Sequence, residues 1–258
     1  MRFPCHARRI SAMRITKKEV GGNESGIDKE IPASGIMTRA QMHESAKKRV
    51  DLITKEFRDG FEFLENYPRS VTVFGSSHAT EKDLYYQKAL SLCRRVATEL
   101  KYSVITGGGP GIMEAANRGA FEAQGQSVGI TIKLPHEQAT NSYITDKIAL
   151  TYFFVRKVCL SFSAEAYVFF PGGFGTLDEL FEILTLVQAR KIESVPLILV
   201  GSEYWRLLET FIREELLNRK MIGPDDISLF TVQDDEDKIL EIIKKTPIRN
   251  GVEYNHQT

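Results

Sequence analysis

The sequence predicts an α/β protein built on a single doubly wound parallel sheet. From Val71 onward, short runs of apolar and β-branched residues alternate with segments whose apolar residues recur at helical spacing. Three of the strand-like runs are each followed by a turn of small, flexible residues and then by a helical segment. This alternation is typical of parallel sheets with helices on both faces, because parallel strands need crossover connections.

The composition fits one folded domain with an extension. The chain has 258 residues, of which 42% are hydrophobic, enough for a substantial core. Lys and Arg together number 34, as do Asp and Glu, so the net charge favours neither nucleic acid nor a membrane surface as a partner. No apolar run approaches the length that spans a bilayer. The three cysteines lack zinc-site spacing and do not make an even disulfide set, which favours a reducing cytoplasm. Cys93 and Cys159 are expected to be buried.

The chain before the first strand divides into an extension and one helix. Residues 1–40 show little apolar periodicity and are interpreted as a flexible extension, so the folded domain is placed at residues 41–250. Residues 42–67 predict an amphipathic helix. Its apolar stripe consists of Val50, Ile53, Phe57, Phe61 and Leu64.

The remaining elements alternate in order along the chain. Strands are expected at residues 71–74, 103–106, 127–131, 165–170, 195–200 and 227–232. Helices are expected at residues 82–100, 112–121, 152–163, 180–188, 203–219 and 234–245. Residues 134–143 are interpreted as an irregular polar stretch.

The turn after residue 170 carries the strongest chemical signal. It reads Pro171-Gly-Gly-Phe-Gly-Thr-Leu-Asp-Glu179. Glycines let the backbone approach a ligand closely, and a helix start offers unpaired N–H groups and the positive end of the helix dipole. Thr176 adds a hydroxyl, while Asp178 and Glu179 add carboxylates. The segment therefore predicts a phosphate-bearing ligand beside an acid or base.

The same residues also fit a purely structural role. In a capping box, Thr176 would cap the helix and Glu179 would reach back to the N–H of the capping residue. Glycines before a helix are often only turn residues. On this segment alone, both interpretations stay open.

Two further turns favour a ligand site. Gly107-Gly-Gly-Pro-Gly111 follows the strand at 103–106, and Gly75-Ser-Ser77 follows the strand at 71–74. The former is not a dinucleotide fingerprint, because Ile112 stands at the third glycine position, and it is not a Walker loop. The carboxyl ends of parallel strands meet at one edge, where open α/β sheets bind ligands.

A basic pair lies inside the apolar helix at 152–163. Arg156 either extends to the surface or faces the glycine edge, where it would pair with Glu179 or with a ligand phosphate. Lys157 is expected to point to solvent. The polar loop around His136 and Asn141 is either a ligand contact or a solvated turn. Since His136 has no second histidine at ligand spacing, no metal site is expected.

These motifs together resemble one protein family. The segment 171–179 is similar to the PGGxGTxxE signature of the Lonely Guy (LOG) proteins, cytokinin riboside 5′-monophosphate phosphoribohydrolases long called "lysine decarboxylases". The resemblance extends through Gly107-Gly-Gly-Pro-Gly-Ile-Met113, Leu134-Pro-His-Glu-Gln138 and Phe153-Phe-Val-Arg-Lys157, and covers residues 70 to 245. Nothing in the chain resembles the lysine motif of a pyridoxal-phosphate decarboxylase.

The resemblance implies a Rossmann-like fold and a hydrolase. Such enzymes cleave the N-glycosidic bond of AMP or N6-prenylated AMP, releasing the free base and ribose 5-phosphate. The resemblance assigns the catalytic roles to Arg156 and Glu179, and no cofactor is expected. The candidate substrate- and phosphate-binding residues are Gly108, Gly109, Gly111, Glu137, Lys157, Gly172, Gly173, Gly175, Thr176 and Thr185.

The resemblance also bears on partners. Family members are at least dimers with the active site close to the subunit interface, so a homodimer or higher homo-oligomer is expected, with residues 152–163 and 180–190 as interface elements. A protein that binds a nucleotide or a related cofactor without cleaving it is the alternative function. The presence of both Arg156 and Glu179 favours catalysis over this carrier role.

Overall fold

The computed structural model describes residues 38–133 and 140–247. The chain divides into two units, residues 1–47 and 48–258. Of the first unit the structure describes only residues 38–47, which contain the start of helix α1 (Arg39–Leu64). The predicted extension therefore lies almost wholly outside the described residues, as does the loop at 134–139.

The second unit is built on one parallel sheet. Within the described residues, seven strands lie in the order β4-β3-β2-β1-β5-β6-β7, and every neighbouring pair is parallel. The strands are β1 (Ser70–Phe74), β2 (Ser103–Thr106), β3 (Ser127–Ile132), β4 (Asp146–Leu150), β5 (Ala166–Phe169), β6 (Leu197–Leu199) and β7 (Thr231–Val232). The chain builds outward from β1 to β4 and then returns to β5 on the other side of β1. The predicted doubly wound sheet is confirmed, with its switch point between β1 and β5.

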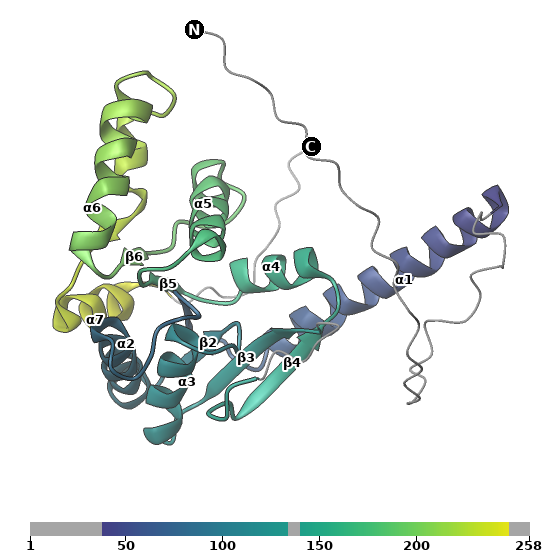
Figure 1. The fold of residues 1–258 in the computed structure, drawn as a ribbon, viewed down its shortest axis with the longest axis horizontal. Coiled ribbons are helices and arrows are strands. Elements are labelled where there is room, and N and C mark those ends of the chain that lie inside the picture. Colours follow the sequence, from purple (N-terminus) through teal and green to yellow (C-terminus); the bar gives the residue numbers. More distant parts are fainter. Residues whose placement is uncertain (1–37, 134–139, 248–258) are drawn as a thin grey trace, which may run out of the picture. The chain divides into compact units, whose positions relative to one another are not determined.

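Helices cover both faces of this sheet (Figure 1). They are α2 (Leu84–Arg95), α3 (Ile112–Glu122), α4 (Phe153–Ser161), α5 (Phe174–Gln188), α6 (Ser202–Phe211) and α7 (Glu236–Lys245). Short π-helical turns extend α2 (Val96–Leu100) and α6 (Ile212–Leu217), and a 3₁₀ segment (Pro224–Leu229) precedes β7.

The strands contribute side chains to two hydrophobic cores, one on each face of the sheet, because successive side chains of a strand point to opposite faces. In β5, Ala166 and Val168 join a cluster with α2, α3 and α7, whereas Tyr167 and Phe169 join a second cluster with α4 and α5. The fully buried Trp205 of α6 belongs to the second cluster. Burial on both faces explains why the central strands read as continuous apolar runs in the sequence.

Three elements differ from the sequence-based expectations. Strand β4 was not predicted, because it is an edge strand whose polar residues are largely exposed. Residues 227–229 are helical rather than extended, since the segment Pro224–Leu229 starts with a proline at a favoured helical position. Helix α5 begins at Phe174 rather than Leu180, so Thr176 lies inside the helix.

Cys93 and Cys159 are free and buried, as expected. None of the helices described is long and apolar enough to cross a membrane. In the part of the chain that the structure describes, His, Cys, Asp and Glu residues form no cluster of three or more that would hold a metal ion.

Candidate functional site

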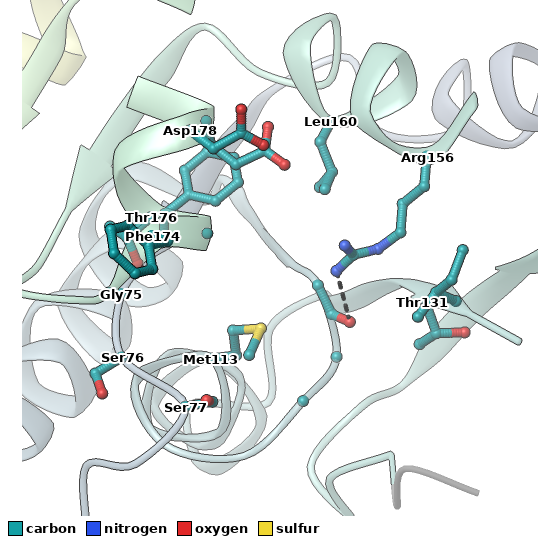
Figure 2. Close-up of a pocket in the computed structure, with 18 of the residues that line it drawn as sticks. Gly75, Ser76, Ser77, Met113, Thr131, Arg156, Leu160, Phe174, Thr176 and Asp178 are labelled. Carbon is teal, nitrogen blue, oxygen red and sulfur yellow. Dashed lines mark hydrogen bonds between the residues drawn. The ribbon is translucent and has the colours of Figure 1, made fainter. Parts of the chain in front are cut away.

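A pocket of about 440 Å³ opens at the carboxyl edge of the sheet, beside the switch point (Figure 2). The turns after β1, β2 and β5 all line it, so the predicted convergence of the three turns is confirmed. Helix α4 contributes Arg156, and the first turns of α5 contribute Thr176, Asp178 and Glu179. The pocket thus combines backbone-rich turns with one guanidinium and two carboxylates.

Hydrogen bonds through Ser76 join the three turns into one unit. The N–H of Ser76 donates to the carbonyl of Pro171 at 3.0 Å, and the N–H of Ile112 donates to the carbonyl of Ser76 at 2.9 Å. Gly111 has φ of +73°, and a Cβ there would lie 2.3 Å from the Ser76 carbonyl oxygen. Only glycine fits this position, because both the backbone conformation and the close approach exclude a side chain.

Two buried asparagines hold the Gly107–Gly109 turn. The N–H of Asn141 donates to the carbonyl of Gly108 and its Nδ2 donates to the carbonyl of Gly109, both at 3.0 Å. The same Nδ2 donates to Oδ1 of Asn117, which also accepts a 2.6 Å bond from the Thr106 hydroxyl. Asn141, one of the two possible ligand contacts in its loop, is therefore engaged in holding the turn.

The start of α5 is bare of side-chain caps. Gly173 is the N-cap residue and no side chain caps the helix, so the capping box proposed for Thr176 and Glu179 does not form. An added Cβ at Gly173 or Gly175 would meet no heavy atom within 4 Å, whereas one at Gly172 would lie 2.1 Å from the Thr176 hydroxyl oxygen. The first N–H groups of α5, which have no partner within the helix, thus adjoin open space suited to an anion.

The carboxylate of Glu179 is buried and incompletely hydrogen-bonded. Its side chain lines the pocket but is only 6% exposed, and its buried Oε2 atom has no hydrogen-bond partner. Burial raises the pKa of this carboxyl to about 7; Lys157 and Arg156 oppose the rise, and Glu182 and Asp178 add to it. Buried polar atoms are nearly always paired, so an unpaired carboxylate oxygen at a pocket indicates a role toward a ligand.

Arg156 lies across the pocket from α5 and points its guanidinium inward (Figure 2). Its Nε donates to the carbonyl of Ile130 at 2.8 Å and its Nη2 donates to that of Gly107 at 3.3 Å. A Cβ at Gly107 would lie 2.1 Å from Nη2, which explains the glycine there. Burial lowers the pKa of Arg156, and Glu179 partly offsets this. Arginine nevertheless stays charged, and its remaining N–H groups are free to meet a ligand.

The structure decides between the two alternatives for Arg156. The side chain does not extend to the surface but faces the glycine edge. Among the described residues, however, no hydrogen bond or ion pair joins Arg156 to Glu179. The two charged groups instead face the same cavity from different helices.

Lys157 and Thr185 do not line this pocket; both line a second hollow between α4 and α5, beside Phe154 and Phe181. The Lys157 ammonium is 2.6 Å from Asp178 and 2.7 Å from Glu182, and the side chain is only 16% exposed, so it does not point to solvent either. Thr185 is exposed, and its hydroxyl donates to the carbonyl of Phe181 at 2.7 Å. Glu137 lies outside the described residues.

The other candidates differ in their position. Gly108, Gly109, Gly173, Gly175 and Thr176 line the pocket, whereas Gly111 and Gly172 support its turns from behind. Sequence reasoning missed several lining side chains. These are Ser76, Ser77, His78, Met113, Thr131, Thr140, Phe153 and Phe174. The predicted turn at Gly75–Ser77 already pointed to the two serines. No pattern in the sequence indicated that Phe174, whose side chain is 93% exposed, lines the pocket.

Because the pKa of Glu179 is raised in the folded protein, the stability of the fold should depend on pH. The unfolded chain loses this proton near the ordinary value of 4.5, whereas the folded protein keeps it up to about 7. The stability that the protonated group contributes is therefore complete below pH 4.5 and lost as the pH rises through 7. We expect the free energy of unfolding of Glu179→Gln to exceed that of wild type by up to roughly 3 kcal/mol at pH 8. At pH 4.5 the two proteins should differ little in stability. Urea denaturation at both pH values measures this, and an equal difference at both would contradict the assignment.

Known proteins resemble the chain in sequence. Residues 113–243 match the family model described as "Possible lysine decarboxylase". The chain is 25% identical over 194 residues to cytokinin riboside 5′-monophosphate phosphoribohydrolase LOG5 of Arabidopsis thaliana, covering 74% of this chain and 84% of that protein. It is 28% identical over 162 residues to pyrimidine/purine nucleotide 5′-monophosphate nucleosidase of Escherichia coli K12, covering 56% of this chain but only 34% of that protein.

Solved structures resemble it in fold. The X-ray structure of TM1055, a structural genomics target, has a TM-score of 0.52 and 27% identity, covering 68% of this chain and 98% of its own. The molybdenum cofactor carrier protein of Chlamydomonas reinhardtii has a TM-score of 0.50 and 20% identity, covering 69% and 99%. At that identity the second likeness shows the fold alone.

Proposed function

Because this chain belongs to the LOG family, whose model is described as "Possible lysine decarboxylase", we propose that it hydrolyses the N-glycosidic bond of a purine nucleoside 5′-monophosphate. The products are the free base and ribose 5-phosphate. The observation that carries the proposal is the buried carboxylate of Glu179, which has an unpartnered oxygen and faces the same pocket as Arg156 and the glycine turns.

The charges of the pocket suit this reaction. As the bond between the ribose C1′ and the base nitrogen breaks, its electron pair leaves with the base and positive charge develops on the ribose. An ionised Glu179 stabilises that charge, and it does so strongly because the site is buried. Water supplies the new oxygen on C1′, one of its protons stays on the sugar hydroxyl, and the other passes to the base nitrogen.

Arg156 serves the leaving group in this proposal. Two backbone carbonyls fix its side chain, so its free N–H groups are already oriented when the substrate arrives. A guanidinium donates hydrogen bonds to a ring nitrogen that gains electron density, which makes the base a better leaving group. Fixing Arg156 before binding also avoids an entropic cost during the reaction.

The substrate carries a 5′-phosphate because the pocket offers an anion cradle. The uncapped N-terminus of α5 and the turns at Gly107–Gly109 and Gly75–Ser77 line the pocket together with Glu179, where we place the ribose. Binding energy from the phosphate then positions the sugar for reaction. Plain AMP and N6-prenylated AMP are both candidates; the relatives are named for a cytokinin riboside 5′-monophosphate and a pyrimidine/purine nucleotide 5′-monophosphate.

Gly173→Ala tests the phosphate cradle. Its backbone at φ −91° and ψ −157° suits alanine, and the added methyl meets no protein atom within 4 Å, so we expect an unchanged fold. The methyl occupies space beside the first N–H groups of α5, and the KM for AMP should therefore rise roughly tenfold or more while thermal stability stays the same. Gly223→Ala, in a turn outside the pocket, is the matched control. An unchanged KM in the first variant would place the phosphate elsewhere.

The exposed aromatic residues of α4 and α5 support a homodimer. Phe153 is 55% exposed, Phe154 49% and Phe181 39%, and exposed apolar groups of this size on neighbouring helices are typical of interfaces. We expect light scattering to give about twice the chain mass of 29.2 kDa. A particle that remains at the mass of one chain would exclude the dimer.

The competing function is a carrier that binds a nucleotide without cleaving it. The unpartnered, buried carboxylate favours the hydrolase, because it can stabilise the positive charge that the ribose develops only when the bond is cleaved. Incubating the protein with AMP and recovering the bound molecule separates the two functions. A hydrolase releases adenine, while a carrier returns intact AMP.

A further inference from the structure

Three carboxylates crowd the first two turns of α5. Asp178, Glu179 and Glu182 lie within five residues of one another, and only Glu179 is fully buried. The side chains of Asp178 and Glu182 are 56% and 27% exposed. Since like charges three or four residues apart on a helix destabilise each other, a nearby cation stabilises this cluster.

Lys157 of α4 provides that compensation from across the helix pair. Its ammonium donates to Asp178 Oδ2 at 2.6 Å and forms an ion pair with Glu182 Oε2 at 2.7 Å. Burial works to lower the pKa of Lys157, but the two carboxylates outweigh it and raise the pKa. Lys157 therefore stays charged at neutral pH.

The position of Lys157 excludes two simpler roles. It does not line the pocket, and its ammonium already faces two carboxylates, so it is not a phosphate ligand. An ordinary surface ion pair contributes little to stability, but this lysine is only 16% exposed and lies directly after Arg156 in the helix that supplies the site.

We propose that Lys157 is a positioning residue for Glu179. By pairing with Asp178 and Glu182, it compensates the two negative charges nearest to Glu179 in the helix, so that the Glu179 carboxyl can ionise where it faces the pocket. The consequence of this arrangement for catalysis rests on the proposed function, whereas the effect of Lys157 on the ionisation of Glu179 can be measured in the protein without substrate. It assigns a role to the second residue of the Arg156-Lys157 pair that is distinct from substrate contact.

The charges that face Glu179 support this assignment. Asp178 and Glu182 on α5 disfavour its ionisation, whereas Lys157 and Arg156 on α4 favour it, and Lys157 is the stronger of the two. His78, in the turn after β1, is the remaining titratable side chain of the pocket lining. Without Lys157, the negative charges of Asp178 and Glu182 would disfavour ionisation of Glu179, and Arg156 would be the remaining cation that opposes them.

The test is a titration of Glu179 in the free protein. Its carboxyl signal is followed by ¹³C NMR against pH and assigned by its loss in Glu179→Gln. We expect Lys157→Met to raise the titration midpoint by roughly one unit, and Lys157→Arg, which keeps the charge, to restore it. Lys245→Met, which breaks an exposed ion pair with Glu241 outside the site, is the matched control and should leave the midpoint unchanged.

A second variant keeps the test decisive if Lys157→Met does not fold. Asp178→Asn combined with Glu182→Gln removes the two carboxylates and should lower the Glu179 midpoint in the presence of Lys157. An unchanged midpoint in Lys157→Met or in the double variant would overturn the inference.

Activity gives an independent readout. A midpoint raised by one unit reduces the ionised fraction of Glu179 at pH 7 about fivefold, so hydrolysis by Lys157→Met should fall by that factor and recover at higher pH. If wild type releases no base at all, the proposed function fails, yet the NMR titration still decides the role of Lys157.

Discussion

Glu179→Gln is expected to lower kcat for nucleoside monophosphate hydrolysis by roughly 10²-fold or more, with KM nearly unchanged. The variant keeps the size of the side chain and removes its charge, so it loses the group that stabilises the developing positive ribose. Because Glu179 does not cap its helix, the loss is not an effect of a broken capping box. Steady-state release of base measures the effect.

Glu193→Gln is the matched control for this variant. It removes an exposed carboxylate between α5 and β6, one that does not line the pocket. We expect it to retain full activity. If Glu179→Gln turned over AMP as fast as Glu193→Gln, then Glu179 would have no catalytic role, and its burial would need another explanation.

Arg156→Met should have a comparable effect, with a loss of roughly 10²-fold in kcat. Methionine fills similar space and removes a buried charge without leaving a carboxylate unpaired, because Arg156 forms no ion pair with Glu179. The fold should therefore persist, which circular dichroism and thermal unfolding can verify. The kcat for hydrolysis of AMP is the decisive quantity.

Arg156→Lys sharpens the same prediction. A lysine keeps the charge, but it cannot reproduce the planar fork that reaches both Ile130 and Gly107. We expect most of the activity to be lost in this variant as well. Arg219→Met, in an exposed i,i+4 ion pair with Glu215, serves as the control and should behave as wild type. Full activity of Arg156→Lys would show that charge alone suffices.

Much of the fold could be predicted because the central strands are buried on both faces. Their apolar runs, such as Ala166–Phe169, are distinct from the helical periodicity around them. Strand β4 escaped prediction because an edge strand keeps polar, exposed residues and has no such run. The strand predicted at 227–232 is wrong in its first half, because the proline-initiated 3₁₀ segment Pro224–Leu229 includes Ile227.

The site was predictable at positions where the backbone conformation or a close approach requires glycine. Glycine turns at the ends of strands imply a shared edge, and that edge carries the pocket. Side-chain directions were harder to foresee. Arg156 and Lys157 are adjacent in sequence, yet one enters the pocket and the other turns toward two carboxylates, because neighbouring helical residues point about 100° apart.

The start of α5 illustrates the same limit. Thr176 and Glu179 have the spacing of a capping box, but the helix begins earlier, at Phe174, and this places both side chains within the helix. The spacing alone cannot distinguish a cap from two residues of a helix interior. The position of the N-cap residue, Gly173, decides between them.

The most direct test of the central claim is quantification of both products from AMP. Wild-type protein and Glu179→Gln are incubated with AMP, and adenine and ribose 5-phosphate are measured by chromatography over time. We expect wild type to release the two products in equal amounts over many turnovers and Glu179→Gln to release neither at a comparable rate. Tight binding of AMP by wild type without release of either product would contradict the hydrolase assignment and identify the protein as a nucleotide carrier.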